Sequence, residues 1–257
     1  MPVISWLWRD PRRWFVAAYA AVPIACAVDA KLSLTESQQW VLAGLGWLVV
    51  VGGLLELPRR RQIALVCFLP LITLAEFALS HGLGWYSYRL GNIPPWLPPA
   101  HGIVFLTALR AIDTQWVSTR VLAWAAGGAQ AVYCALNLFL RDDELGALFG
   151  VVFLIGMVVL PDAGKRFYAS LGLMVAYLEI VGSALGTWRW APELLGLNEA
   201  NPPSGAVGGY SLIDGAAFVL AALALRMVPR LAGRSRERAT PEHAVFGQGL
   251  ADAGGGT

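Results

Sequence analysis

The chain has 257 residues, of which 57% are hydrophobic and only 14% are charged, whereas about 25% of the residues in ordinary soluble domains are charged. This composition excludes a water-soluble surface and indicates that the protein is solvated largely by lipid. The net charge is only +2 and the basic residues are spread between apolar runs, which argues against nucleic-acid binding. Three cysteines inside apolar runs, without metal-type spacing, argue against a disulfide framework or a zinc site.

Eight apolar segments follow one another along the chain. Several of them approach the ~20 residues that cross the hydrocarbon core of a bilayer as a helix. The sequence therefore predicts an all-α, polytopic membrane helix bundle with about eight transmembrane helices. The predicted spans are 14–30, 38–56, 62–81, 100–115, 119–139, 145–160, 166–186 and 208–227.

The basic residues between the spans are distributed unequally. Fifteen of the nineteen Lys and Arg residues fall on one side of the predicted bundle, and only Lys31, Arg89, Arg141 and Arg189 fall on the other. Cytoplasmic loops are enriched in Lys and Arg, so we expect a cell-membrane protein with both termini cytoplasmic. Residues 1–230 then form one integral membrane domain, and residues 231–257 form a disordered cytoplasmic tail.

One motif, L-P-x17-E-x3-S-x4-W, occurs twice with an offset of 103 residues. A Glu inside a membrane span is rare, so its recurrence in register indicates a duplication into halves at about 12–115 and 119–227. An even number of spans in each half makes this a parallel repeat, with both motifs facing the external side. The copies comprise Leu57, Pro58, Glu76, Ser80 and Trp85, and Leu160, Pro161, Glu179, Ser183 and Trp188.

Glu76 and Glu179 are the first candidate catalytic residues. Each lies nine residues before a boundary Trp, roughly 10–13 Å inside the membrane at 1.5 Å per residue. A carboxylate at that depth needs a proton or a hydrogen-bonding partner, and two near one axis would suit general acid and base catalysis. Alternatively, each Glu hydrogen-bonds the Ser four residues later and fixes helix packing. Asp214, in the external half of the last span, is a third candidate acid.

Aromatic and proline-rich segments follow both acidic motifs. An interfacial aromatic belt accounts for some of these rings, but the cytoplasmic loops have no comparable density of aromatic residues and prolines. We therefore expect an aromatic-lined pocket over the two acids, suited to an apolar ligand or to a cation formed from it. The candidate binding residues are Trp85, Tyr88, Trp96, His101, Trp188, Trp190, Asn201 and Tyr210.

No motif for a nucleotide, a haem, a catalytic metal or a retinal-type Lys is found in the sequence. We therefore expect no cofactor and no metal site.

The two external motif regions, about 70 residues in all, share an order of residues. An intramembrane Glu is followed by a G-x-Y-x-Y-like segment at residues 84–88, and in the second half Trp188-x-Trp190 precedes a proline and glycine segment and then Tyr210. This order resembles that of the bacterial and archaeal membrane carotenoid hydratases. Members of that family add water across the terminal double bond of a linear carotenoid. The resemblance implies that Glu76 and Glu179 protonate the alkene or activate water.

The resemblance also implies which residues shape the polyene pocket. These are Trp85, Tyr88, Trp188 and Trp190. The chain departs from the family pattern at Trp85, in the proline-rich run 94–99 and at residues 201–203, which bear on the choice of substrate.

These observations lead to one functional expectation and two alternatives. We expect a cofactor-independent membrane enzyme that acts on a hydrophobic lipid or isoprenoid by acid-initiated hydration, cyclisation or isomerisation. Its acids would protonate an alkene, and its aromatic faces would stabilise the resulting cation. A proton-coupled transporter or lipid carrier is the first alternative, because repeated halves with intramembrane carboxylates also occur in transporters. A non-catalytic membrane scaffold is the second.

Overall fold

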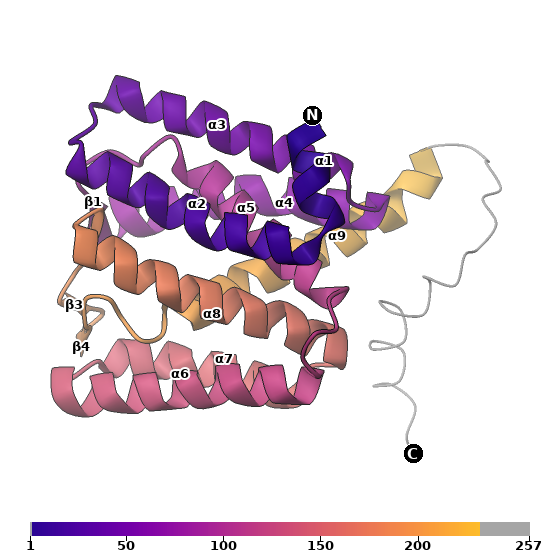
Figure 1. Ribbon diagram of the computed structural model, residues 1–257. Coiled ribbons are helices and arrows are strands. Elements are labelled where there is room, and N and C mark those ends of the chain that lie inside the picture. Colours follow the sequence, from indigo (N-terminus) through magenta and orange to yellow (C-terminus); the bar gives the residue numbers. More distant parts are fainter. Residues whose placement is uncertain (1, 232–257) are drawn as a thin grey trace, which may run out of the picture.

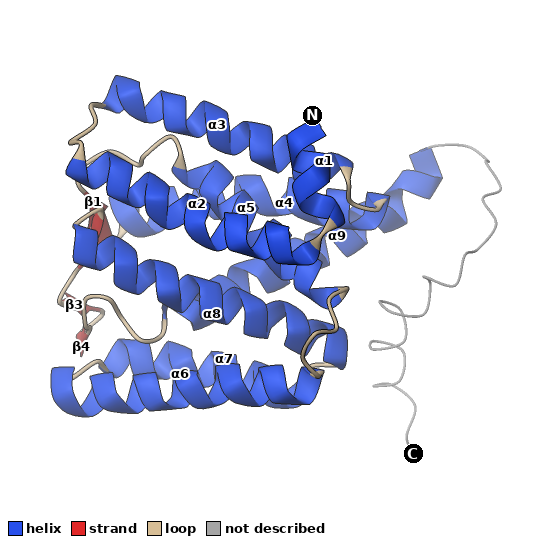
Figure 2. Ribbon diagram, in the orientation of Figure 1, coloured by secondary structure: helices blue, strands red, loops and turns tan. Residues whose placement is uncertain are grey.

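The computed structural model describes residues 2–231, and most of them are helical (Figure 1, Figure 2). The helices are α1 (Pro2–Arg9), α2 (Pro11–Lys31), α3 (Glu36–Leu55), α4 (Arg59–Glu76), the π-helix η1 (Phe77–Gly82), α5 (Leu97–Ile112), α6 (Thr119–Arg141), α7 (Glu144–Val159), α8 (Asp162–Leu185) and α9 (Ala206–Leu231). The strands are β1 (Tyr86–Tyr88), β2 (Trp188–Trp190), β3 (Glu193–Leu194) and β4 (Leu197–Asn198). The tail predicted at 231–257 lies, apart from its first residue, outside the described residues.

Each predicted span coincides with one helix from α2 to α9, and the all-α fold class is confirmed. Six of the described helices are long and apolar enough to cross a membrane, namely α2, α3, α4 with η1, α6, α8 and α9. The other two, α5 and α7, have 16 residues each. That is a length of about 24 Å, which is shorter than the ~30 Å hydrocarbon core. The six long helices indicate a multi-pass membrane protein.

Local sequence signals explain several helix ends. Thr35 accepts a hydrogen bond from the backbone N–H of Gln38, whose side chain accepts one from the backbone N–H of Thr35, so that α3 begins with a capping box. Ser118 caps α6 by accepting from the backbone N–H of Val121. At its other end, α6 stops at Asp142, which adopts the left-handed conformation.

The helices from α2 to α9 alternate in direction along the bundle (Figure 1). As a result, α1 and the C-terminal part of α9 lie at one end of the bundle and the strands lie at the other. The aromatic segments that follow α4 and α8 were expected to be loops. They instead form β1 and β2, which pair antiparallel with Tyr86 opposite Trp190 and Tyr88 opposite Trp188. The sequence did not reveal this pairing for two reasons. Each strand has only three residues, which is too short for a clear alternation of buried and exposed side chains, and the two strands are about 100 residues apart in the chain.

The centre of the bundle is α5, which packs against α2, α3, α4 and α8. Thirteen of its sixteen residues are buried. Neighbouring helices therefore shield α5 from lipid. Phe105 of α5 stacks on Phe68 of α4 with ring centroids 4.3 Å apart, and it also contacts Phe167 and Phe218 from α8 and α9. This aromatic cluster joins helices from both predicted halves.

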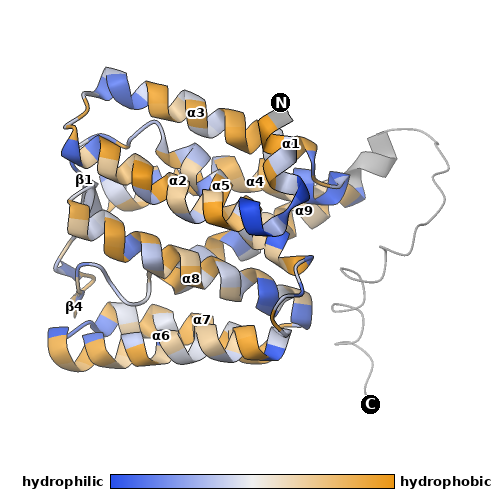
Figure 3. Ribbon diagram, in the orientation of Figure 1, coloured by the Kyte–Doolittle hydropathy of each residue, from blue (hydrophilic) through white to orange (hydrophobic). Residues whose placement is uncertain are grey.

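The outer helices expose large apolar side chains. On α6, for example, Trp124 is 74% exposed and Phe139 is 81% exposed. Hydrophobic residues extend along the outward faces of the bundle, and hydrophilic residues gather towards the helix ends (Figure 3). This arrangement is the inverse of a soluble surface and is expected where lipid surrounds the helices.

A buried polar cluster holds the end of the bundle where the strands lie. Asp29, which is fully buried at the end of α2, accepts hydrogen bonds from Gln39 and from Arg89. The Arg89–Asp29 distance is 2.6 Å, and Arg89 also donates to the carbonyl of Leu34. Since Arg89 directly follows β1, this ion pair fixes the strand against α2 and α3.

The alternating helices predict where thiol reagents reach the chain. We expect Asn198→Cys and Ser118→Cys to be labelled from opposite sides of the membrane, because the β3–β4 turn and the α5–α6 loop lie at opposite ends of the bundle. Both positions are exposed, whereas Cys26 and Cys134 are buried. The measurement is labelling of intact and permeabilised cells with a membrane-impermeant maleimide. Labelling of both variants from one side would contradict this fold.

Candidate functional site

Glu76, the last residue of α4, is buried and forms hydrogen bonds with three side chains. The hydroxyl groups of Tyr86 and Tyr88 donate to Oε2 at 2.7 and 2.6 Å. Nε2 of His101 lies 2.9 Å from Oε1. Burial, followed by the charge of Glu76, raises the pKa of both phenols, so both stay protonated donors.

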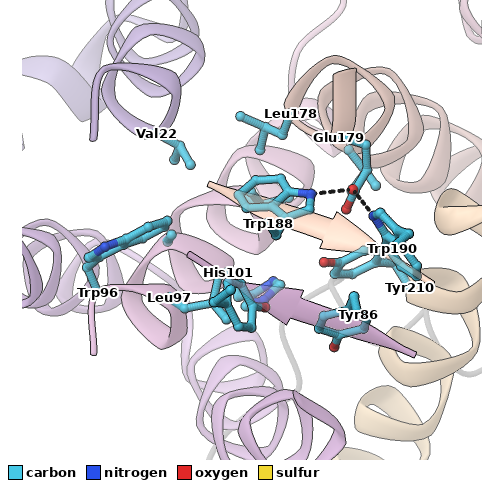
Figure 4. Close-up of a pocket in the computed structure, with 14 residues that line it drawn as sticks. Val22, Tyr86, Trp96, Leu97, His101, Leu178, Glu179, Trp188, Trp190 and Tyr210 are labelled. Atoms are coloured by element: carbon cyan, nitrogen blue, oxygen red, sulfur yellow. Dashed lines mark hydrogen bonds between the residues drawn. The ribbon is translucent and has the colours of Figure 1, made fainter. Parts of the chain in front are cut away.

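Glu179 of α8 is also buried, and its partners are two indoles. Nε1 of Trp188 and Nε1 of Trp190 donate to Oε2 at 2.8 and 3.0 Å, so both bonds meet at one oxygen (Figure 4). A Cβ atom at Gly182 would collide with the ring of Trp188. The glycine therefore leaves room for this indole to lie on α8 and reach the carboxylate.

The two carboxylates are thus held in the same way. Each accepts from two aromatic side chains at alternate positions of one strand, with an exposed residue between them. In the first half these side chains are 10 and 12 residues after the Glu, and in the second they are 9 and 11 residues after it. The π-helix η1 accounts for the extra residue, because it has more residues per turn than an α-helix.

This offset corrects the expected equivalence of Trp85 with Trp188. By their contacts, Tyr86 corresponds to Trp188 and Tyr88 corresponds to Trp190. The alternative in which each Glu bonds the Ser four residues later is also wrong. The Ser183 hydroxyl is buried without a hydrogen-bond partner in the described part of the chain.

Two adjoining cavities lie beside the paired strands, whereas the sequence predicted one. The smaller has a volume of about 50 Å³ and is lined by Glu179 and mainly aromatic and apolar side chains (Figure 4). The larger has a volume of about 240 Å³ and is lined by Glu76. Tyr86, Trp190 and Tyr210 line both cavities and form the wall between them. The two acids therefore face separate spaces on either side of an aromatic wall.

The candidate binding residues divide between these cavities. Trp85 lines only the larger, and Trp190 and Tyr210 line both. Asn201 lines neither, because its Oδ1 accepts a hydrogen bond from the backbone N–H of Trp190 and supports β2. Tyr88, Trp96, His101 and Trp188 line only the smaller cavity.

Asp214 is not brought to either acid. It is fully buried in α9, and neither of its carboxyl oxygens has a hydrogen-bond partner among the described residues. It is also absent from the lining of both cavities. The site as observed therefore assigns no contact with a ligand to Asp214.

Glu199 is a third acid of the site, which the sequence analysis missed. It is 6% exposed, it lines the larger cavity, and Nε1 of Trp85 donates to its Oε2. Burial, which outweighs the opposing hydrogen bond from Trp85, raises the pKa of Glu199 to about 8 together with smaller contributions from the charges of Asp143 and Glu179. Glu199 is therefore a largely protonated acid at neutral pH. A single Glu in a polar loop gave no signal of this placement.

Asp143 fixes the loop that carries Glu199. Asp143 lies in the turn between α6 and α7 and is fully buried. Its carboxylate accepts from the backbone N–H groups of Ala200 and Ser204 at 3.0 and 2.7 Å, and from the Ser204 hydroxyl at 2.6 Å. These three bonds hold residues 200–204 against the start of α7 and direct the neighbouring Glu199 inwards.

Comparisons of the chain with family models, with curated proteins and with solved structures find no match. Within residues 2–231, no group of three or more His, Cys, Asp or Glu residues could hold a metal ion. Neither of the two cavities is lined by Lys or Arg. The groups that could take part in a reaction here are therefore buried carboxyl groups, one imidazole, phenols and indoles around an apolar space.

The raised pKa of Glu199 predicts a pH-dependent stability. In the unfolded chain Glu199 titrates near 4.5, and in the folded protein it titrates near 8. The folded state therefore binds more protons between these values, and its stability is greatest below about pH 4.5 and falls as the pH rises through about 8. We expect the thermal midpoint in detergent to fall across this window and Glu199→Gln to flatten the fall. An unchanged slope in the variant would contradict the placement of Glu199.

Proposed function

We propose that this protein is a membrane enzyme that acts on an isoprenoid or related lipid by protonating an alkene. Hydration, cyclisation and isomerisation all begin with this step. The observation that supports the proposal is the pairing of buried carboxyl groups with aromatic walls in two apolar cavities inside a lipid-exposed helix bundle. A hydrophobic substrate would reach such a site from the bilayer without crossing water.

The aromatic lining suits the intermediate of such a reaction. Protonation of a trisubstituted alkene leaves a tertiary cation, which ring faces attract. The wall between the cavities has three rings, from Tyr86, Trp190 and Tyr210, and each cavity is also lined by a carboxyl group. Fixed dipoles and charges in a dry site stabilise developing charge more strongly than water does. The resemblance to membrane carotenoid hydratases agrees with this chemistry and is part of the proposal.

We further propose that all eight helices from α2 to α9 cross the membrane as two parallel repeats. The cavity linings support this. Ile72, Ala75 and Glu76 in the larger cavity have counterparts 103 residues later in the smaller, namely Val175, Leu178 and Glu179. On the other wall, residues 96, 97, 100, 101 and 104 of the smaller cavity have counterparts 109 residues later in the larger, at 205, 206, 209, 210 and 213.

In this arrangement both termini are cytoplasmic and the strands lie at the external side. The support is the concentration of basic residues at the end opposite the strands. Both cavities then open in the external half of the membrane. A proton-coupled transporter would need access to the acids from both sides in turn, and the positions of the cavities favour an enzyme.

Replacing the Glu76 carboxyl group by an amide tests the proposed chemistry. We expect mass spectrometry of lipid extracts to find a lipid that gains one water, or changes to an isomer, only when the gene is expressed. Glu76→Gln should lower this conversion by about 100-fold or more, because Gln is close to Glu in size and keeps one accepting oxygen, but it carries no negative charge and cannot exchange a proton. Glu36→Gln is the matched control, because Glu36 is exposed and lines neither cavity.

The thermal midpoint of each variant is measured in parallel to separate loss of fold from loss of chemistry. Full conversion by folded Glu76→Gln would reduce Glu76 to a structural residue. An unchanged lipid extract together with pH-dependent solute uptake would favour the transporter.

A further inference from the structure

The two cavities, although lined by corresponding residues, differ in what covers them. The smaller cavity is covered by α2, which packs against α5 and α8 and contributes Val22 to the lining. Its other lining residues are buried except for Tyr210, which is partly exposed. The helix that corresponds to α2 in the second half is α6, which packs on α7 and α8. No residue of α6 lines the larger cavity, so this cavity has no such cover.

The rim of the larger cavity is exposed and apolar. Leu212 of α9 is 54% exposed, and Leu79 and Phe149, from η1 and α7, are partly exposed. These side chains lie on the outward part of helices that expose large apolar residues elsewhere. The larger cavity therefore communicates with the lipid phase between α4 and α7.

The inner end of the larger cavity is polar. Glu76 and Glu199 both line it, together with Trp85. Trp85 donates to one oxygen of Glu199, and no hydrogen bond from a described residue reaches the other oxygen. Glu76 already accepts from two phenols and lies against His101. Glu199 is thus the acid with a free oxygen, and Glu76 is the acid whose hydrogen-bonding capacity is occupied.

We infer that only the larger cavity binds substrate and that Glu199 is the proton donor, an inference that rests on the proposed function. The cavity takes the terminal alkene of an isoprenoid chain that enters between α4 and α7. A volume of about 240 Å³ is below the ~300–1,000 Å³ of typical sites for whole small ligands. The cavity therefore takes the end of a chain while the rest of the chain stays in lipid.

The proton transfer needs no reagent other than water and regenerates the acid. The O–H bond of Glu199 breaks, its proton forms a C–H bond at the less substituted alkene carbon, and the tertiary cation lies against the aromatic wall and the Glu76 carboxylate. In a hydration, a water molecule bonds to the cation and returns one proton to Glu199. In an isomerisation, the carbon next to the cation loses a proton to Glu199 and a new double bond forms. Either path regenerates the acid.

Two variants of the larger cavity test this inference. Glu199→Gln keeps an oxygen that accepts from Trp85 but cannot donate a proton to carbon, so conversion of the lipid should fall by about 100-fold or more. Gly209→Leu should fill the cavity, because a Cβ at Gly209 meets no atom within 4 Å. The matched controls are Glu193→Gln in β3, which is exposed, and Gly128→Leu on the exposed face of α6, where a Cβ also meets nothing. Both controls should stay within twofold of the parent protein.

Photolabelling locates the ligand independently of turnover. A diazirine-bearing polyprenol, incorporated with the protein in lipid nanodiscs, should label Leu79, Phe149 or Leu212, and Gly209→Leu should reduce the labelling at least tenfold. Labelling at Val22 or Leu97, labelling that Gly209→Leu does not change, or no labelling at all would overturn the assignment of the cavity.

The two proposals fail in different ways. If the parent protein converts no lipid, the proposed function fails whatever the photolabelling result. If the parent protein converts the lipid and folded Glu199→Gln converts it equally well, the enzyme stands and the role of Glu199 is wrong.

Discussion

Two carboxyl groups buried in an apolar bundle, without Lys or Arg beside them, are the constraint on which the site depends. An unpartnered carboxylate in such a place is strongly disfavoured. The chain meets this requirement with neutral donors, two phenols at Glu76 and two indoles at Glu179, presented at alternate positions of a two-stranded ladder. His101 adds a third hydrogen-bonding contact, with its Nε2 2.9 Å from Oε1 of Glu76. The pairing of β1 with β2 therefore places aromatic N–H and O–H groups within hydrogen-bonding distance of both acids.

The rest of the architecture supports that ladder. Arg89 and Asp29 fix the end of β1 against α2 and α3, and Asn201 holds the backbone of β2. Asp143 ties down the loop that carries Glu199. Because these buried polar groups satisfy one another, aromatic side chains and carboxyl groups can occupy an apolar interior. The same arrangement leaves apolar space on both sides of the ladder, and that space is what a hydrophobic substrate needs.

Hydropathy predicted the helices well, because the need to satisfy every backbone group inside lipid makes long apolar runs helical. The rarity of intramembrane Glu likewise identified Glu76 and Glu179 as buried residues of the site. The details that failed depend on long-range contacts or on a local irregularity. The pairing of Tyr86 with Trp190 joins distant segments, and the π-helix after Glu76 shifts the register by one residue, which no periodicity in the sequence reveals. Glu199 and Asp143 look like surface residues in the sequence, because only the folded chain brings residues 199–204 against the start of α7.

The most direct test of this account is a double-mutant cycle between Glu76→Leu and Tyr88→Phe, because Leu cannot accept the hydrogen bond from the Tyr88 hydroxyl. The free energy of unfolding is measured in mixed micelles for the parent protein, both single variants and the double variant. A hydrogen bond to a buried carboxylate contributes about 1.5–3 kcal/mol, so the account predicts a coupling energy of about that size between the two sites. Additivity within about 0.5 kcal/mol would show that the phenol does not hold the carboxylate and would contradict the central role of the ladder.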